Sequence, residues 1–558
     1  MNTLAIETWI HCWNFCDAAE LRRLSLVCRY FRTLCQPLLF HSQCVKAPHP
    51  DVRRRNWIKL TDKVHQTAEN LKDLAASTHA ASVREWQCIG GRSIDLQQRF
   101  HSIADIHVLV DAWQTVLKIF SATLGAYQRV TVLRLDDFTI DAGFRTTLES
   151  LGSLEDLSLL RCNIICRTGN LLPLKTFSIT GWSDVPPADG VGAIRIVAPH
   201  SLGRLIIGAL IDGKYLLTTL VGYPLPKLVY LSVALTARIS DLFFACLEFC
   251  PQLECIHIWY DESIQRIGDA PGGLTPPDHL PSTILPVLNS FRGPFILAGV
   301  FLRDRPVNDV ELSRPISAMT VEQIGSTLVA ISHGSIPIRG LSIGASFPPA
   351  PGREIFALVR ELFPELRILS IRLTDETYWP IEVPDDGDTT DDEDDSSSAG
   401  SDAEYSAAPV VPAPSAEQPG YMYGPSNAVH APDGEVLQQE GTASPVTITM
   451  DLIHTRRILL PPHLQVLRFT QRPACLVKTV FTSPEQHRAV LMLEALLPAL
   501  DEVAFSDCEN QWLRDRHVWT RDSNVPKSHV WGNPGVKIIS MAWNADGKRR
   551  EETSFFGL

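Results

Sequence analysis

The stretch Leu154-Glu155-Asp156-Leu157-Ser158-Leu159 shows the pattern that decides the fold of this 558-residue chain. Its first, fourth and sixth residues are apolar, so a short strand can bury one face and leave the other in solvent. The same six-residue unit recurs along the chain, starting at Val130, Leu174, Leu202, Leu228, Leu253, Ile338, Leu366, Leu464 and Leu500. The early units are spaced by about 20 to 28 residues, a range typical of proteins built from stacked repeats.

Repetition of this unit predicts an α/β fold in which the strands stack side by side. No single unit buries its apolar face alone, so the units are stable only as an array, which we expect to be a curved solenoid with a strand-lined inner face. The segments at 241–248 and 354–360 carry helical periodicity before the next strand. The match to the plain leucine-rich repeat is loose, because its asparagine position is mostly absent. We therefore expect an irregular leucine-rich-repeat solenoid over residues 127–382.

The first forty residues have a different, helical pattern. Apolar residues at 6, 9, 10 and 13 form the stripe of an amphipathic helix. Asp17 and Glu20 have the spacing of a capping box, which starts a second helix. Pro37 is expected to end the helical stretch, because proline lacks an N–H and restricts the residue before it. A unit this small needs another surface to cover its apolar faces.

This N-terminal sequence resembles an F-box. The matching strings are Leu4 to Glu7 (LAIE), Glu20 to Arg32 (ELRRLSLVCRYFR) and Pro37 to Phe40 (PLLF), with Ala5 where the family usually has proline. In that family the motif packs onto an adaptor of the Skp type, which links the protein to a cullin. The resemblance implies adaptor-facing or supporting roles for Leu4, Ile6, Leu21, Leu24, Val27, Cys28 and Phe31. An ordinary helical hairpin that caps a repeat array is the other interpretation of these residues.

The whole chain is similar to proteins that join an F-box to degenerate leucine-rich repeats, a type expanded in mushroom-forming fungi. The resemblance implies the substrate-recognition subunit of an SCF-type cullin-RING E3 ubiquitin ligase, whose repeats bind a target protein. The alternative is a non-catalytic leucine-rich-repeat scaffold whose F-box acts outside a cullin complex. Residues 1–45 are the expected F-box, 46–126 a helical neck that caps the first repeat, and 446–558 the last repeats and a C-terminal cap.

Residues 383–445 change in character and are rich in Asp, Ser, Pro, Ala and Gly. Because the segment has few large apolar residues, the surface it can bury does not offset the conformational entropy lost on ordering. We therefore expect a disordered acidic insertion. Thr389, Thr390 and the serines of 396–401 lie among acids and are candidate phosphorylation sites, although an unregulated insertion is equally compatible with the sequence. The net charge of −13 is concentrated here, which leaves the rest of the chain nearly neutral and argues against nucleic acid as a partner.

Composition also limits the cellular compartments in which we expect the protein. The 13 cysteines are scattered through a long chain, whereas disulfide scaffolds are short and dense in cysteine, so reduced residues are expected. Residues 1–15 contain no Lys or Arg, and no apolar run approaches the roughly 18 residues needed to span a bilayer. We expect a soluble protein of the cytoplasm or nucleus, with no membrane partner. The basic cluster at 548–550 is too short to distinguish these two compartments.

No pattern predicts catalysis, a metal or a cofactor. The sequence Gly340-Leu341-Ser342-Ile343-Gly344 fits the nucleophile elbow of a hydrolase, but Ser342 occupies the fifth position of a repeat unit. Serine stands at the same position at 158, 178, 232 and 370, so the repeat explains it. His11, Cys12 and Cys16 lie on one expected helix and do not supply the four convergent ligands of a zinc site. We therefore expect a protein that is not an enzyme.

The target is expected to bind on the inner face of the array. That face should display the second, third and fifth residues of each unit and the residue that follows it, including Arg134, Ser158 and His257. Trp259 and Arg372 are the candidate target-binding residues, because Trp and Arg dominate the energetics of protein interfaces. The competing interpretation is that Trp259 packs under the segment 261–277 as a structural residue, since Trp is usually buried.

Overall fold

The structure is a computed structural model of the chain. It describes residues 5–13, 15–47, 57–90, 104–166, 169–181, 194–208, 210–236, 239–259, 277, 280–313, 319–347, 349–373, 445–471, 483–505, 510–515, 518–522, 536–543 and 549–556. The predicted acidic insertion and its candidate phosphorylation sites, up to residue 444, lie outside these residues.

One long sheet runs through the molecule and confirms the α/β class. It has 16 strands, and neighbours in space follow the order of the chain. The strands up to β16 pair in parallel, while β16–β17 and β17–β18 are antiparallel. The strands are β1 (Ser42–Lys46), β2 (Glu85–Ile89), β3 (Val132–Asp136), β5 (Asp156–Leu160), β7 (Thr176–Thr180), β8 (Arg204–Gly208), β9 (Tyr230–Ala234), β10 (Cys255–Trp259), β11 (Ser290–Gly293), β12 (Asp309–Leu312), β13 (Gly340–Phe347), β14 (Ile368–Leu373), β15 (Val466–Gln471), β16 (Glu502–Phe505), β17 (Asn510–Asp515) and β18 (Val518–Asp522).

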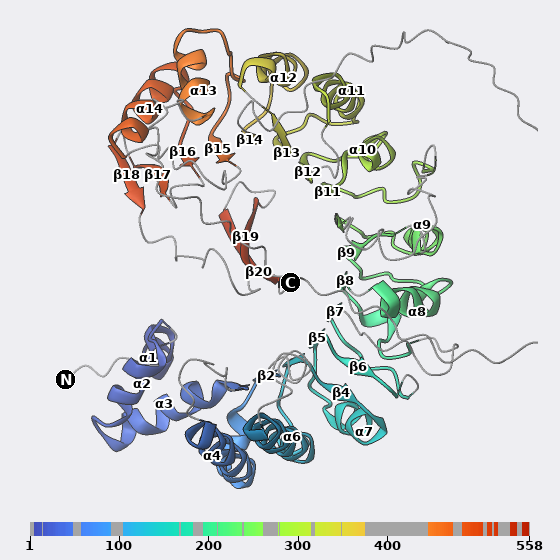
Figure 1. Cartoon of the computed structure of the whole chain (residues 1–558), viewed down its shortest axis with the longest axis vertical. Helices are drawn as coiled ribbons and strands as arrows, with labels where there is room; N and C mark the ends of the chain where they lie inside the picture. The colour runs from blue at the N-terminus through green and yellow to red at the C-terminus, as the bar shows by residue number, and fades with distance from the viewer. Residues whose placement is uncertain are drawn as a thin grey trace, which may run out of the picture.

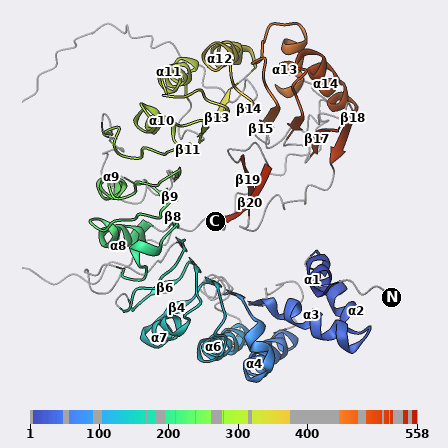
Figure 2. The ribbon, with the colours of Figure 1, turned by 180° about the vertical axis from the view of Figure 1, so that it is seen from behind.

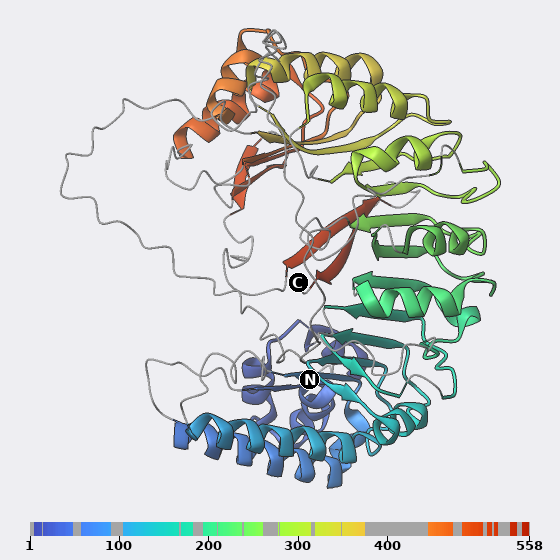
Figure 3. The ribbon, with the colours of Figure 1, turned by 45° about the vertical axis from the view of Figure 1, so that its right-hand side comes forward.

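The return segments lie on the outer side of this sheet. Figure 1 shows the strands following one another around the inside of an open arc with helices outside it, and Figure 2 shows the same arrangement from behind. The outer helices are α4 (Trp57–Ala76), α6 (Ala104–Leu124), α7 (Ala142–Ser150), α8 (Leu210–Leu220), α9 (Ser240–Leu247), α10 (Phe295–Leu302), α11 (Val321–Ser332), α12 (Pro349–Leu362), α13 (Pro445–His454) and α14 (Ser483–Leu496), with the 3-10 turns η2 (Thr78–Ser82) and η3 (Pro199–Ser201). Figure 3 shows the strands from the side, with α4 and α6 side by side at the N-terminal end. The short strands β4 (Thr139–Ile140) and β6 (Asn163–Ile164) pair separately, as do β19 (Val536–Trp543) and β20 (Arg549–Phe556).

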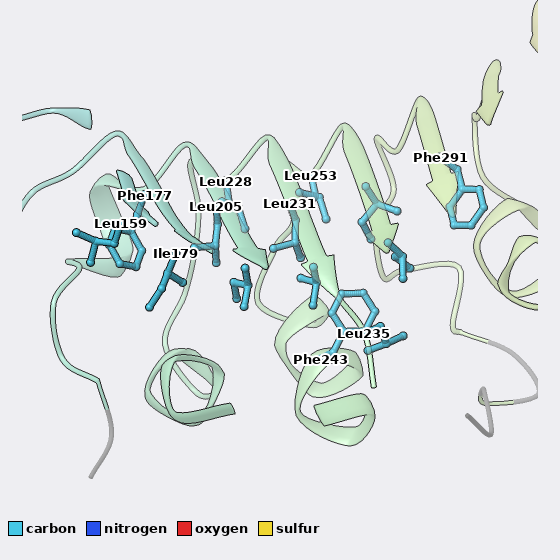
Figure 4. Packing of buried hydrophobic residues seen from close by; sticks show 14 of the residues in the cluster. Leu159, Phe177, Ile179, Leu205, Leu228, Leu231, Leu235, Phe243, Leu253 and Phe291 are labelled. Atoms are coloured by element: carbon cyan, nitrogen blue, oxygen red, sulfur yellow. The ribbon is translucent and has the colours of Figure 1, made fainter. Parts of the chain in front are cut away.

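The apolar positions of the six-residue unit form the core. In the unit that ends in β5, Leu154, Leu157 and Leu159 are all buried, and the same three positions are buried in every unit predicted from the sequence. Figure 4 shows Leu159, Ile179 and Leu231 on the side of the strands that faces the helices. The third and fifth positions are mostly half-buried and line the inner face. One continuous apolar cluster therefore runs from β1 to β16.

The sheet begins earlier and has fewer gaps than the sequence predicted. The expected helical neck contains α4 and α6, but also β1 and β2, which pair with each other and with β3. In the gap left between the units at 253 and 338, β11 and β12 continue the parallel ladder. On the other side of residues 374–444, β14 pairs with β15 over six residues without a shift. The array is therefore continuous across the segment that carries the acidic run.

Three helices precede the sheet: α1 (Ile6–Trp13), α2 (Ala18–Ser25) and α3 (Arg29–His41). The expectation that Pro37 ends the third helix was wrong, because α3 continues through Pro37 to His41. Leu38 and Leu39 pack against the core of the three helices, and Phe40 stacks on His79 with ring centroids 4.5 Å apart. These contacts offset the one backbone hydrogen bond that proline removes.

Candidate functional site: an apolar helical unit and the inner face of the sheet

The three N-terminal helices form a core of their own. Trp13, Leu21 and Cys35 are buried in it, separate from the cluster under the sheet. The ring of Phe31 lies 4.8 Å from that of Trp13 and 5.5 Å from that of Trp9, measured between centroids. This aromatic contact joins α1 to α3 and gives the unit most of its interior.

Side chains at the helix starts fix the turns of this unit. The backbone N–H of Glu20 donates to Oδ1 of Asp17 at 2.7 Å, and the N–H of Asp17 donates to Oε2 of Glu20 at 2.9 Å, which is the predicted capping box. Cys28 caps α3, because its Sγ accepts from the N–H of Phe31 at 3.4 Å. The turn between α2 and α3 therefore has a defined shape, and it presents residues 26 and 27 outward.

The predicted adaptor residues divide into two groups. Leu21 is buried and Leu24 and Phe31 pack against the core, so they support the unit from within. Ile6, Val27 and Cys28 are exposed. Leu4 lies outside the described residues.

Large apolar side chains are exposed on this unit, and most of them are not among the predicted adaptor residues. Phe15 is 80% exposed, Leu26 76% and Val27 66%, and Tyr30 is also exposed. Three of the four lie within residues 26–30, at the turn that Cys28 caps. Helical periodicity missed Phe15 and Leu26 because they lie in turns, where the direction of a side chain depends on tertiary packing. Such a concentration of uncovered apolar surface in a unit this small indicates a docking site.

The two candidate target-binding residues lie on the inner face but not together. Trp259 ends β10 and Arg372 lies near the end of β14, and both are half-buried. Four strand steps separate β10 from β14 in the sheet, or about 19 Å at the usual strand spacing. One small ligand cannot contact both residues, whereas an extended protein segment can. Most of the segment 261–277, under which Trp259 was alternatively expected to pack, lies outside the described residues.

Trp259 belongs to a polar and aromatic cluster on strands β8 to β12. Its Nε1 donates to Nδ1 of His257 at 2.8 Å, so the imidazole is neutral and accepts at Nδ1. Burial, assisted by the positive charges of Arg292 and Arg204, lowers the pKa of His257 to about 3. The guanidinium carbon of Arg204 lies 3.9 Å from the centre of the Tyr230 ring, a cation–π arrangement.

The far side of this cluster carries paired charges. Nε of Arg292 lies 3.6 Å from Oε2 of Glu311, and the Ser290 hydroxyl donates to Oδ2 of Asp309 at 3.2 Å. Burial raises the pKa of Asp309, against the opposing charges of Arg292 and Arg468 and the bond from Ser290. Gly340 lies beside this carboxylate, and a Cβ at that position would be 2.5 Å from Oδ1 of Asp309. The cluster thus combines aromatic rings with charged groups that face one another across neighbouring strands.

The sites considered for chemistry have simple structural explanations. Ser342 lies inside β13, between Glu311 and Ser370 on the neighbouring strands, and not at a turn into a helix. Among the described residues, no group of three or more His, Cys, Asp or Glu is placed to hold a metal ion. The buried Cys250, three residues after α9, donates from its Sγ to the carbonyl of Cys246 at 3.2 Å, as a structural cysteine does. In the part of the chain that the structure describes, no helix has the length and apolar content to cross a membrane.

No protein-family model matches the chain, and no curated protein is significantly similar to it. Its function must therefore be argued from its own residues.

Proposed function

We propose that this protein is the substrate-recognition subunit of an SCF-type cullin-RING ubiquitin ligase. In this proposal the three N-terminal helices are an F-box that binds a Skp-type adaptor. The sheet and its outer helices are an irregular leucine-rich-repeat solenoid that binds a target protein on the inner face. The chain itself carries out no chemistry, and ubiquitin transfer belongs to its partners.

One observation carries the proposal. Leu26 and Val27 are among the most exposed large apolar residues described, and they lie within the string that resembles the F-box. The capped turn holds them in place, so the surface is formed before any partner binds. Pre-formed apolar surface binds with little further loss of conformational entropy. The family resemblance identifies the partner as a Skp-type adaptor. The exposed apolar surface of Leu26 and Val27 is the surface that such a partner would cover.

The architecture of the body agrees with a receptor role. A parallel array offers a long inner face with polar, charged and aromatic side chains whose spacing is set by the sheet. Trp259, Tyr230 and Arg204 have the composition of an interface hot spot. The same face is compatible with a scaffold, so the cullin is the partner that separates the two functions.

The test is co-purification of the intact chain with the Skp-type adaptor and cullin of its host. The informative variant is Leu26→Asp with Val27→Asp, because both side chains are exposed and their replacement leaves the helical core unchanged. Burial of a Leu and a Val in an interface contributes about 3–6 kcal/mol, so the variant should lose at least about a hundredfold in adaptor affinity. Val329→Asp on α11 places the same charge at another exposed valine and should bind normally.

Each result has a defined meaning. Capture of adaptor and cullin by the wild type and by Val329→Asp, but not by the double variant, supports the ligase receptor. Capture of the adaptor without a cullin favours the scaffold whose F-box acts outside a cullin complex. Failure of the folded wild type to capture the adaptor refutes the F-box itself. Near-ultraviolet circular dichroism confirms that each variant is folded.

A further inference from the structure

The inner face changes in charge after β12. On β13 to β15 and the residues directly before them, the basic residues are Arg339, Arg367, Arg372 and Arg468, which we call the arginine stripe. Over the same three strands, the exposed or half-buried positions of the six-residue units carry no acid; besides arginines they hold Ser342, Ile368, Ser370 and Gln465. This part of the surface is therefore basic, in a chain whose net charge is negative.

Two members of the stripe are forced together by the sheet. Arg339 and Arg367 immediately precede β13 and β14, and the N–H of Arg367 donates to the carbonyl of Arg339 at 2.8 Å. Both side chains are exposed, and neither forms an ion pair with any residue that the structure describes. Like charges directly opposite one another on neighbouring strands destabilise a sheet. An anionic ligand would remove this repulsion.

Three of the acids at the margins of the stripe have other partners. Glu502 on β16 accepts from Nε and Nη2 of Arg468 at 3.0 and 2.8 Å, which satisfies one arginine and leaves the pair at the strand starts unmatched. Glu311 lies against Arg292, and Asp309 accepts from Ser290. Glu365 and Asp501 are exposed near the strand starts but form no ion pair among the described residues. None of these acids forms an ion pair with Arg339 or Arg367 among the residues that the structure describes.

The dimensions fit a peptide rather than a single small anion. Arg367 and Arg372 lie five residues apart at the two ends of β14, or about 16 Å along the strand. Between them β13 and β14 present Ser342, Ser370 and the half-buried Ile368, with Gly340 beside them. An extended segment of about five residues spans this length, and serine hydroxyls and guanidinium groups both donate to carboxylate or phosphate oxygens.

We propose that the arginine stripe binds a segment of the partner protein that is dense in anionic side chains. The inference deepens the proposed function, on which it rests for the role of that partner as the ligase target. Carboxylates and phosphorylated side chains share the chemistry that the stripe recognises. Charge complementarity of this kind sets specificity and the rate of encounter, while Trp259 and its neighbours provide apolar contact further along the same face.

The test is fluorescence anisotropy of three labelled probes with the intact chain. The probes are a 12-residue peptide rich in Asp and Glu, a peptide of the same length with phosphoserines, and a single-stranded oligonucleotide of matched charge. The variant Arg339→Glu with Arg367→Glu should weaken peptide binding at least about tenfold at low salt, and raising the salt should reduce the difference. Arg353→Glu with Arg360→Glu is the matched control, because both arginines are exposed on α12 of the same repeat.

The outcomes separate this inference from the proposed function. The proposal is supported if the stripe variant loses peptide binding while the control binds normally and both capture the adaptor. The peptide that binds more tightly then shows whether carboxylates or phosphoserines are the preferred anions. Equal binding by both variants refutes it, as does tighter binding of the oligonucleotide. To exclude competition from the chain's own acids at 385–404, the titration is repeated with those acids replaced by Asn and Gln. Absence of binding there too overturns the inference, whatever the adaptor result.

Discussion

Replacement of Arg305 by Met should destabilise the middle of the array. Arg305 is 1% exposed and follows α10, yet its guanidinium reaches two separate segments. Nε donates to Ile284, Nη1 to Val300 and Arg303, and Nη2 to Leu280 and Pro281, all through backbone carbonyls 2.9 to 3.1 Å away. The side chain therefore ties the segment before β11 to the end of α10.

The magnitude follows from the number of these bonds. Hydrogen bonds to a charged group contribute about 1.5–3 kcal/mol each, so five represent about 8–15 kcal/mol before desolvation is counted. Burying the guanidinium costs several kcal/mol, which is the reason that burial lowers the pKa of Arg305. The carbonyl end of α10 offsets part of this cost, because the helix dipole favours a cation there. We expect a net loss of about 3–5 kcal/mol for Arg305→Met, the usual cost of breaking a buried charged network.

The assay is urea unfolding combined with amide hydrogen exchange. The variant should unfold at lower urea, and protection should fall first in residues 280–284 and 295–302, because repeat arrays can open locally. Arg303→Met is the matched control, since that side chain is 73% exposed and only two residues away. A change below about 0.5 kcal/mol in Arg305→Met, or an equal change in the control, would refute this account.

Two further predictions concern the polar cluster on the inner face. Gly340→Ala should destabilise the protein by about 1–3 kcal/mol, because the new Cβ meets the Asp309 carboxylate, and Asp309→Ala in the same chain should recover part of the loss in urea unfolding. His257 should make the protein acid-sensitive: its folded pKa of about 3 lies below the unfolded value of about 6.5, so the unfolded state takes up the proton first and stability falls as pH drops through this interval. Between pH 7 and pH 5, wild type should lose about 2 kcal/mol more than His257→Gln, and equal losses would contradict the neutral imidazole.

The sequence predicted the strands whose units are complete and missed those that deviate or lie in an unexpected place. Val307, Val310 and Leu312 fit the pattern, and the last two lie in β12, but their distance from the unit at Leu253, the last one recognised before them, hid them. In β11 the sixth position is Gly293, which looks like a break in the repeat. A Cβ there would meet the ring of Phe291 at 2.8 Å, so the large aromatic at the fourth position takes the space of the missing side chain.

The N-terminal site shows a different limit of sequence reasoning. The apolar pattern identified the helices and the capping box, but it did not separate residues that face inward from those that face outward. Leu24 and Leu26 are both leucines of the same string, yet Leu24 packs in the core and Leu26 is exposed. Which one is covered depends on where α2 ends and α3 begins, and the cap at Cys28 fixes that point. The sequence likewise does not show which residues lie side by side on neighbouring strands, as Arg339 and Arg367 do, because this depends on the register of the strands.

The unbroken register between β14 and β15 makes this protein suitable for fragment complementation. The two strands pair over six residues although they flank residues 374–444, so a cut in that segment would leave the pairing residues of both strands intact. Two separately encoded polypeptides, one ending after residue 373 and one starting before residue 445, would each expose a strand edge that the other can pair with. A split chain of this kind would place the proposed adaptor-binding helices on one fragment and Arg468 on the other. The complete arginine stripe would then form only when the two fragments associate.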